Sequence, residues 1–296
     1  MNQYKSFIYI LPAIIFWSTA PVIVKLYLNN IDIYQIIFFM CLLASICLYV
    51  IMLIMKRTYT IHQYDRYDYL HFALMGFFGI FLYFQFFFFG FFLTTAQETY
   101  VLNYTWPIWM ICFTIILSKD KMKIRNILSI ILGFCGVLII VTKGNFFAFS
   151  ASNLLGYIFA LLSAVCYGLF SAVGKNEDRD PVSSMFFYFL FSSIYAFISL
   201  CLFSNLPILS IGESTAIFWL GICSCALAFV FWFKALHYGK TSLLANIVYL
   251  TPFFSLFFIY IFIVEQIQLT SFFGLMIIAL SIFIEKEDIN YSLKSA

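Results

Sequence analysis

Seven aromatic residues that carry a polar atom fall inside apolar stretches of the sequence, and their chemistry suits a binding site. They are Trp17, Tyr83, Tyr104, Trp106, Tyr167, Trp232 and Tyr249. A ring that faces lipid could equally be phenylalanine, which fills 40 positions. Indole and phenol rings stack on aromatic ligands at about 0.5–1.5 kcal/mol per pair or bind cations at about 0.5–2 kcal/mol. We predict that these residues line a ligand cavity, with Trp17, Tyr104, Tyr167 and Tyr249 facing one central space. The rings alone do not separate the two ligand classes, and such rings also gather at membrane interfaces.

Four further side chains could contact a ligand by charge or by hydrogen bonds. Glu98 is the only carboxylate that could lie inside an apolar segment, where it would bind a proton or an ammonium group. Its alternative place is the first turn of a helix in the headgroup region. Lys234 could neutralise a substrate carboxylate or extend to the headgroups. Asn103 and Asn246 would contact a substrate or join helices by hydrogen bonds.

Two prolines interrupt apolar segments at matching places, Pro107 and Pro252. Proline removes a backbone donor and clashes with the preceding turn, so it kinks or breaks a helix. The carbonyls that this frees are tolerated at membrane depth only where protein or water surrounds them. We predict that both bends belong to a moving gate, with a static bend as the alternative.

Catalytic and metal-binding constellations are missing from the sequence. The three histidines, His62, His71 and His237, are scattered, and the acidic pair Asp65/Asp68 has no second cluster beside it. All eight cysteines fall in apolar runs, which predicts neither a disulfide framework nor a metal site. No phosphate-binding loop of the Gly-x-x-x-x-Gly-Lys kind is present. We therefore expect neither an enzyme nor a cofactor, a metal or a nucleic-acid partner.

The composition defines the elements that must position these residues. Of 296 residues, 64% are hydrophobic, 22% aromatic and 10% charged, whereas soluble domains carry about 25% charged residues. A soluble enzyme is excluded, and an all-α polytopic membrane protein with ten helices is predicted. The expected spans are 7–28, 34–55, 70–93, 99–117, 126–142, 154–173, 184–203, 214–233, 242–264 and 271–284.

The loop charges predict the orientation of these spans. With the N-terminus inside, thirteen of the 16 lysines and arginines lie in inner loops or tails and Lys143 alone lies outside. Positive residues favour the cytoplasmic side. We expect an integral plasma (cell inner) membrane protein with both termini in the cytoplasm.

The two halves of the chain resemble one another at an offset of about 145 residues. Matching pairs along the chain are Gly76 with Gly221, Tyr104 with Tyr249, Pro107 with Pro252, and Asp120 with Glu265; Trp17 pairs with Tyr167 at offset 150. Five spans per copy is an odd number, so the second copy enters from the opposite side. We predict one transport domain built from two inverted five-helix repeats, residues 1–147 and 148–296, an architecture typical of secondary transporters.

These motifs resemble the drug/metabolite transporter superfamily, specifically its ten-helix (EamA-type) branch. The matching residues are Trp17-Ser-Thr-Ala-Pro21 with Lys25, Gly76, Asn103-Tyr-Thr-Trp-Pro107, Gly133-Phe-Cys-Gly136, Lys234-Ala-Leu-His237, Tyr249-Leu-Thr-Pro252, Glu265 and Gly274. The resemblance covers residues 7–284. The segment 103–107 is also similar to a motif of bacterial aromatic amino-acid exporters. The second span has Met40 and Cys41 where an arginine is common, and the first span lacks the glutamate of four-helix multidrug relatives.

The resemblance implies a secondary transporter of amino acids, aromatic ones included, or of related small metabolites, working by alternating access in the export direction. A nucleotide-like or cationic metabolite or drug is the alternative cargo. An integral-membrane enzyme is the alternative class, and a receptor or scaffold would not explain the inverted duplication. The expected partners are a small-molecule substrate and the lipid bilayer, and a monomer is compatible with the sequence.

Overall fold

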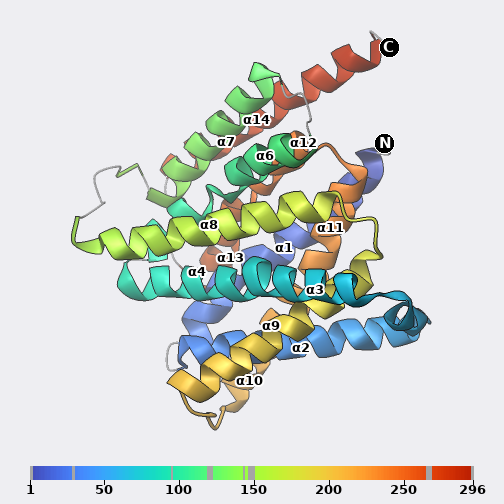
Figure 1. The fold of residues 1–296 in the computed structure, drawn as a ribbon. Helices are drawn as coiled ribbons and strands as arrows, with labels where there is room; N and C mark the ends of the chain where they lie inside the picture. The colour runs from blue at the N-terminus through green and yellow to red at the C-terminus, as the bar shows by residue number, and fades with distance from the viewer. Residues whose placement is uncertain are drawn as a thin grey trace.

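The computed structural model describes residues 3–28, 31–94, 96–118, 123–142, 144–145, 151–264 and 269–294, and the regular elements in these ranges are helices (Figure 1). The first half contains α1 (Gln3–Tyr27), α2 (Ile33–Ile54), η1 (Thr58–Gln63), α3 (Arg66–Met75), η2 (Gly76–Phe81), α4 (Leu82–Leu93), α5 (Ala96–Asn103), α6 (Trp106–Ser118) and α7 (Ile124–Thr142). The second half contains η3 (Ala151–Asn153), α8 (Leu154–Lys175), α9 (Pro181–Phe203), α10 (Ile211–Trp219), η4 (Leu220–Leu227), α11 (Ala228–Tyr238), α12 (Thr241–Val248), α13 (Thr251–Ile263) and α14 (Leu269–Lys294). Asp120, Lys143 and Glu265 lie outside the described residues.

The predicted membrane helices are confirmed in number and order. Within the described ranges, nine helical stretches are long and apolar enough to cross a bilayer, and a shorter apolar helix covers Leu269–Ile284. The third stretch begins at Arg66 and not at 70, because polar residues form its first turn. The last helix continues to Lys294, beyond the predicted end at 284. Hydropathy detects only the part of a helix that is apolar, which explains both differences.

Helix starts on the side of η1 are fixed by short polar side chains. The carboxylate of Asp65 accepts hydrogen bonds from the backbone of Tyr67 and Asp68, and Asp68 in turn accepts from the Asp65 backbone, which completes a capping box at α3. Asp180 caps α9 through the backbone of Ser183, with Pro181 in its first turn. These caps satisfy N–H groups that would otherwise lack partners. The predicted acidic pair Asp65/Asp68 is therefore a helix start.

Two of the predicted spans are each divided into two helices. The stretch 99–117 becomes α5 and α6, and the stretch 242–264 becomes α12 and α13. In both cases proline occupies the first turn of the second helix, where its missing N–H does no harm. The prolines thus mark breaks in the helices. Two other spans contain wider π-helical turns, η2 and η4, which include the matched glycines Gly76 and Gly221.

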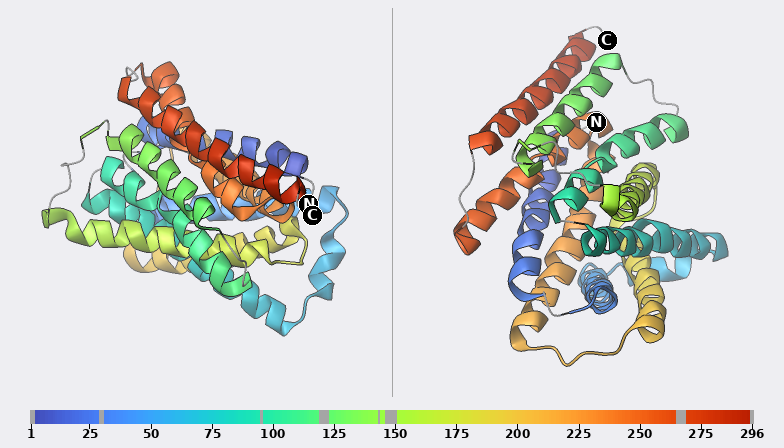
Figure 2. Two further views of the ribbon diagram at one scale, coloured as in Figure 1. Left: turned by 90° about the horizontal axis from the view of Figure 1, so that it is seen from above. Right: turned by 90° about the vertical axis from the view of Figure 1, so that its left-hand side faces the viewer.

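Helices of the first half pack mainly on helices of the second half. α2 lies against α9, α4 and α6 lie against α8, and α1 lies against α11 and α13. α7 and α14 run side by side (Figures 1 and 2). At their crossing, a carbon added to Gly136 would lie 2.7 Å from the carbonyl oxygen of Gly274, so both glycines are needed for this approach.

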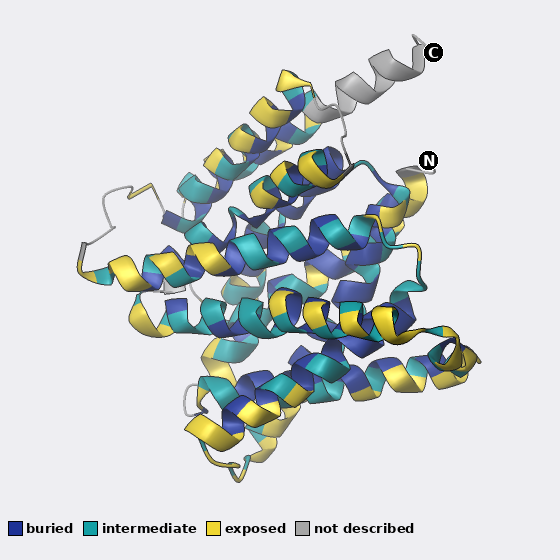
Figure 3. Ribbon diagram, in the orientation of Figure 1, coloured by how far each residue is buried: buried dark blue, intermediate teal, exposed yellow. Residues whose placement is uncertain are grey.

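The surface and the ends of the bundle fit a membrane protein. Exposed residues follow the outward sides of the helices and buried residues follow the inward sides (Figure 3). Large apolar side chains such as Phe92, Ile116 and Leu202 are among the exposed ones, as expected for a lipid-facing surface. The N- and C-terminal helix ends and η1 lie toward the same end of the bundle (Figure 1). Which side of the membrane this end faces stays a prediction.

Candidate functional site

Five of the predicted aromatic residues come together near the middle of the bundle. The ring centre of Tyr167, on α8, lies 4.8 Å from Trp106, 4.9 Å from Tyr83 and 6.2 Å from Trp17. Trp232, on α11, lies 5.3 Å from Trp106 and 5.9 Å from Trp17. We call these five residues the aromatic cluster. Because three of them belong to the first half and two to the second, the cluster lies where the halves meet.

The polar atoms of the aromatic cluster are satisfied to different degrees. The indole N–H of Trp17 donates to the carbonyl of Ser224 in η4 at 3.1 Å, and that of Trp232 donates to the hydroxyl of Ser171 at 3.1 Å. The hydroxyl of Tyr167 is buried and has no hydrogen-bond partner among the described residues. A buried hydroxyl without a partner costs about 1–3 kcal/mol. The two indoles are therefore held in place, whereas the phenol of Tyr167 could accept a visiting polar group.

The two broken helices position part of the cluster and keep their backbone groups satisfied. Trp106 is the first residue of α6, directly after the break. Thr105 and Thr251 each donate from the side chain to a carbonyl of the preceding helix, at Leu102 (2.7 Å) and Val248 (2.6 Å). Ser18 of α1 donates to the carbonyl of Thr251 at 3.0 Å. Protein hydroxyls thus take the place that water would have outside the membrane.

Tyr104, Tyr249 and the two amides lie beside the cluster and make other contacts. The ring of Tyr104 stacks on Tyr100 with centres 6.2 Å apart, and Asn103 donates to Ser163 of α8 at 2.8 Å. Tyr249 is fully buried against α7, where a carbon added to Gly133 would lie 2.7 Å from its ring. Asn246 donates to Ser129 of α7 at 3.0 Å. In the structure, both amides therefore form hydrogen bonds between helices, which is one of the two roles expected for them; the other was contact with a substrate.

The two predicted charged contacts lie elsewhere. Glu98 is 4% exposed and accepts hydrogen bonds from Tyr157 (2.5 Å) and Asn153 (3.3 Å) at the start of α8. It lies in the first turn of α5, and the first turn of a helix is the alternative place that the sequence allows for it. The ammonium of Lys234 lies 5.5 Å from the ring centre of Tyr9 on α1. A cation over an aromatic face is an established stabilising contact.

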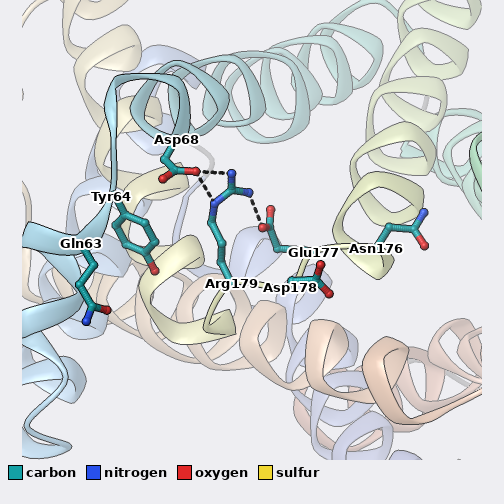
Figure 4. A pocket seen from close by; sticks show the side chains of 7 residues that line it. All are labelled: Gln63, Tyr64, Asp68, Asn176, Glu177, Asp178 and Arg179. Atoms are coloured by element: carbon teal, nitrogen blue, oxygen red, sulfur yellow. Dashed lines mark hydrogen bonds and ion pairs between the residues drawn. The ribbon is translucent and has the colours of Figure 1, made fainter.

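A charged site that the sequence did not predict lies at the end of the bundle where η1 is found (Figure 4). The guanidinium of Arg179, between α8 and α9, donates to Asp68 of α3 and to Glu177. Glu177 also accepts from the hydroxyl of Tyr188 at 2.8 Å and lies 3.0 Å from the ring nitrogen of His71. We call these five residues the charged cluster. Its partners lie more than 100 residues apart in the sequence, except within the 177–188 segment, so spacing alone could not reveal it.

The charged cluster keeps Glu177 ionised. Burial raises the pKa of this carboxyl, but hydrogen bonds from His71, Tyr188 and Arg179, together with the charge of Arg179, outweigh burial and lower the pKa from 4.5 to about 2. The same carboxylates raise the pKa of the Arg179 guanidinium further, despite its partial desolvation. Both groups are therefore charged throughout the physiological range.

Among known proteins, the chain is similar to transporters along most of its length. The model of the EamA-like transporter family matches residues 5–142 and 154–284. An uncharacterized transporter of Archaeoglobus fulgidus is 22% identical over 262 residues, 87% of this chain and 89% of that protein. The aromatic amino acid exporter YddG of Ancylobacter novellus is 24% identical over 163 residues, 54% of this chain and 56% of that one.

One crystal structure of a protein superposes with a TM-score of 0.85, covering 95% of this chain and 97% of the other. Its sequence is 17% identical, so the likeness shows a common fold. The fold, the order of the membrane helices and a family match that spans both halves agree with one another. The chain belongs to the EamA-like transporter family.

Proposed function

We propose that this protein is a secondary transporter that exports amino acids, aromatic ones included, or related small metabolites by alternating access. The observation that carries the proposal is the aromatic cluster, in which residues of both halves meet near the middle of the bundle. Flat rings with one unpaired hydroxyl at Tyr167 suit a cargo that has an aromatic or apolar face and a polar group. The similarity to an aromatic amino acid exporter over about half of the chain adds support.

Alternating access would follow from two inverted repeats, residues 1–147 and 148–296. Contacts recur in matching pairs, which supports this division: α1 packs on α11 and α13, while α8 packs on α4 and α6. Likewise, α2 packs on η4 and α9 packs on η2. Two halves related in this way can exchange conformations, so that one side closes when the other opens. The breaks before Pro107 and Pro252 then occupy equivalent places in the two halves and would bend as gates open.

The test is counterflow in proteoliposomes with labelled aromatic amino acids, aliphatic amino acids, nucleotides and quaternary amines. We expect counterflow of the aromatic amino acids. In Trp106→Phe it should fall severalfold, because the smaller ring loses part of its contact with Tyr167 and Trp232. The matched control is Trp219→Phe, since Trp219 is 39% exposed and lies outside the aromatic cluster.

Each other outcome has a definite meaning. Counterflow of quaternary amines or nucleotides alone would replace the proposed cargo with the cationic or nucleotide-like class, because the same rings also bind cations. An equal loss in both tryptophan variants would show that the aromatic cluster does not select the cargo. Absence of counterflow for every compound, with correctly inserted protein, would contradict the proposed function.

A further inference from the structure

The charged cluster joins the two halves at one end of the bundle. Asp68 and His71 are on α3 of the first half, whereas Glu177, Arg179 and Tyr188 belong to the second half. Two neighbouring contacts cross the same boundary: Arg57 pairs with Asp180, and the hydroxyls of Thr60 and Ser183 lie 2.9 Å apart. The charge count predicts that this end faces the cytoplasm.

Among the described residues, the contact between α2 and α9 at the opposite end is made by uncharged donors. There the first turn of α2 meets the end of α9, and Ser204 donates its hydroxyl to Asp32. The side chain of Gln35 donates to the carbonyl of Asn205 at 2.7 Å. In the Arg179–Asp68 and Arg57–Asp180 pairs both groups are charged, whereas in the Ser204–Asp32 contact only the acceptor is charged.

Arg179 and Glu177 line two pockets. A cavity of about 450 Å³ opens at the end of the bundle and is lined by both residues and by Asp68 (Figure 4). A second pocket of about 10 Å³ shares both residues and is also lined by Ser184 and Phe233. That volume holds about one water molecule. The hydroxyl of Ser184 is 1% exposed and has no hydrogen-bond partner among the described residues.

Packed aromatic rings connect the small pocket with the proposed cargo site. The ring of Phe233 lies 5.0 Å from Phe170, and Phe170 lies 6.1 Å from Tyr167 of the aromatic cluster. A route that opened along these rings would run from Arg179 and Glu177 past Phe233 to the aromatic cluster. The ion pairs stand directly between the outer cavity and this route.

We propose that Arg179, bound to Asp68 and Glu177, is the gate residue that closes the route between the cytoplasm and the aromatic cluster. The inference rests on the proposed transport function, which requires such a route. Opening needs the guanidinium to leave Asp68 on α3, together with release of the neighbouring Arg57–Asp180 and Thr60–Ser183 contacts that cross the same boundary. The side chain of Arg179 is 30% exposed and that of Asp68 is 21% exposed. Water can therefore reach both groups as they part, which keeps the separation reversible.

The test measures the accessibility of the small pocket without any cargo. Ser184→Cys is introduced after replacement of the eight native cysteines, and its labelling by a maleimide is followed from the cytoplasmic side. We expect slow labelling in the otherwise unchanged protein and a rise of about tenfold with Arg179→Gln. Met185→Cys, 1% exposed and lining the same pocket, is the second reporter if the first variant does not fold.

Two controls isolate the ion pairs. Arg66→Gln makes the same change of charge on an exposed arginine of α3 whose guanidinium lies over its neighbour Tyr67, and it should leave the labelling rate unchanged. Gln63→Cys, at the exposed rim of the open cavity, should label at the full rate in every background.

The outcomes separate the gate from the proposed cargo. Equal labelling with and without the Arg179→Gln substitution, or a rise as large in Arg66→Gln, would overturn the gate even if amino-acid counterflow is observed. A selective rise with Arg179→Gln would establish the gate even if no cargo in the panel moves, and the proposed function would then fail by itself.

Discussion

The hydroxyl of Tyr167 gives the sharpest prediction, because its removal should stabilise the protein while harming transport. Tyr167 is 3% exposed, and its hydroxyl has no partner among the described residues. Tyr167→Phe keeps the ring and its contacts with Trp106 and Tyr83. Tyr188→Phe is the matched comparison, since Tyr188 is fully buried too but donates to Glu177 at 2.8 Å.

The two variants should move stability in opposite directions. Removing an unpaired buried hydroxyl recovers about 1–3 kcal/mol, whereas removing a hydrogen bond to a charged group loses about 1.5–3 kcal/mol. For a chain of this size, we expect Tm to rise by about 2–5 °C in Tyr167→Phe and to fall by a similar amount in Tyr188→Phe. Thermal unfolding in one detergent, followed by tryptophan fluorescence, measures both.

Transport should respond to Tyr167→Phe in the opposite sense to stability. If the hydroxyl bonds a polar group of the cargo, its loss should raise KM about three- to tenfold, as a lost neutral hydrogen bond does. The maximal rate should stay close to that of the unchanged protein. A fall in Tm like that of Tyr188→Phe would refute the reasoning, because it would show that the hydroxyl already has a partner in the resting protein.

Three further predictions follow from other parts of the structure. Gly136→Ala should lower the free energy of unfolding by about 1–3 kcal/mol, because the new carbon meets the Gly274 carbonyl at 2.7 Å. The control is Gly212→Ala, whose new carbon meets only a Tyr27 ring at 3.1 Å; it should lower the free energy of unfolding by less in the same melting assay. For Glu177 the lowered pKa means that its stabilising effect is complete above pH 4.5 and is lost as the pH falls toward 2. The stability difference from Glu177→Gln, about 1–2 kcal/mol after solvent screening, should therefore shrink as the pH falls below 4.5. For the orientation, Ser152→Cys should be labelled in intact cells and Gln63→Cys only after permeabilisation; the reverse pattern would place the termini outside.

The sequence predicts the membrane helices well because their signal is local. Each span is a long apolar stretch, and Pro107 and Pro252 indicate the breaks that the structure contains. The π-helical turns were not predicted, although Gly76 and Gly221 were singled out as a matched pair. Glycine makes the close approach of another helix possible, but the widened turn depends on packing against α9 and α2, which only the folded chain supplies.

The candidate site was predicted only in part for a related reason. The rings of five predicted residues do contact one another: Trp17, Tyr83, Trp106, Tyr167 and Trp232. They were predicted because each is an aromatic residue with a polar atom inside an apolar stretch, and such residues favour the interior of a helix bundle. Arg179 was assigned only to an inner-loop charge count, since its partner Asp68 is 111 residues away. The two inner loops that carry them were predicted on the same side, and this was the one available signal for the charged cluster.

The pairing of α7 with α14 has a consequence for how the chain is made. α14 is synthesised more than 100 residues after α7, yet it covers Gly136 on that fifth membrane helix. α2 similarly finds its main neighbour in α9. The ribosome therefore releases five helices into the bilayer before their lasting neighbours exist, and the early helices have only lipid and each other as neighbours during that interval. The α7 helix gains this neighbour only when α14 docks, so a chain that stopped before α14 would leave Gly136 uncovered.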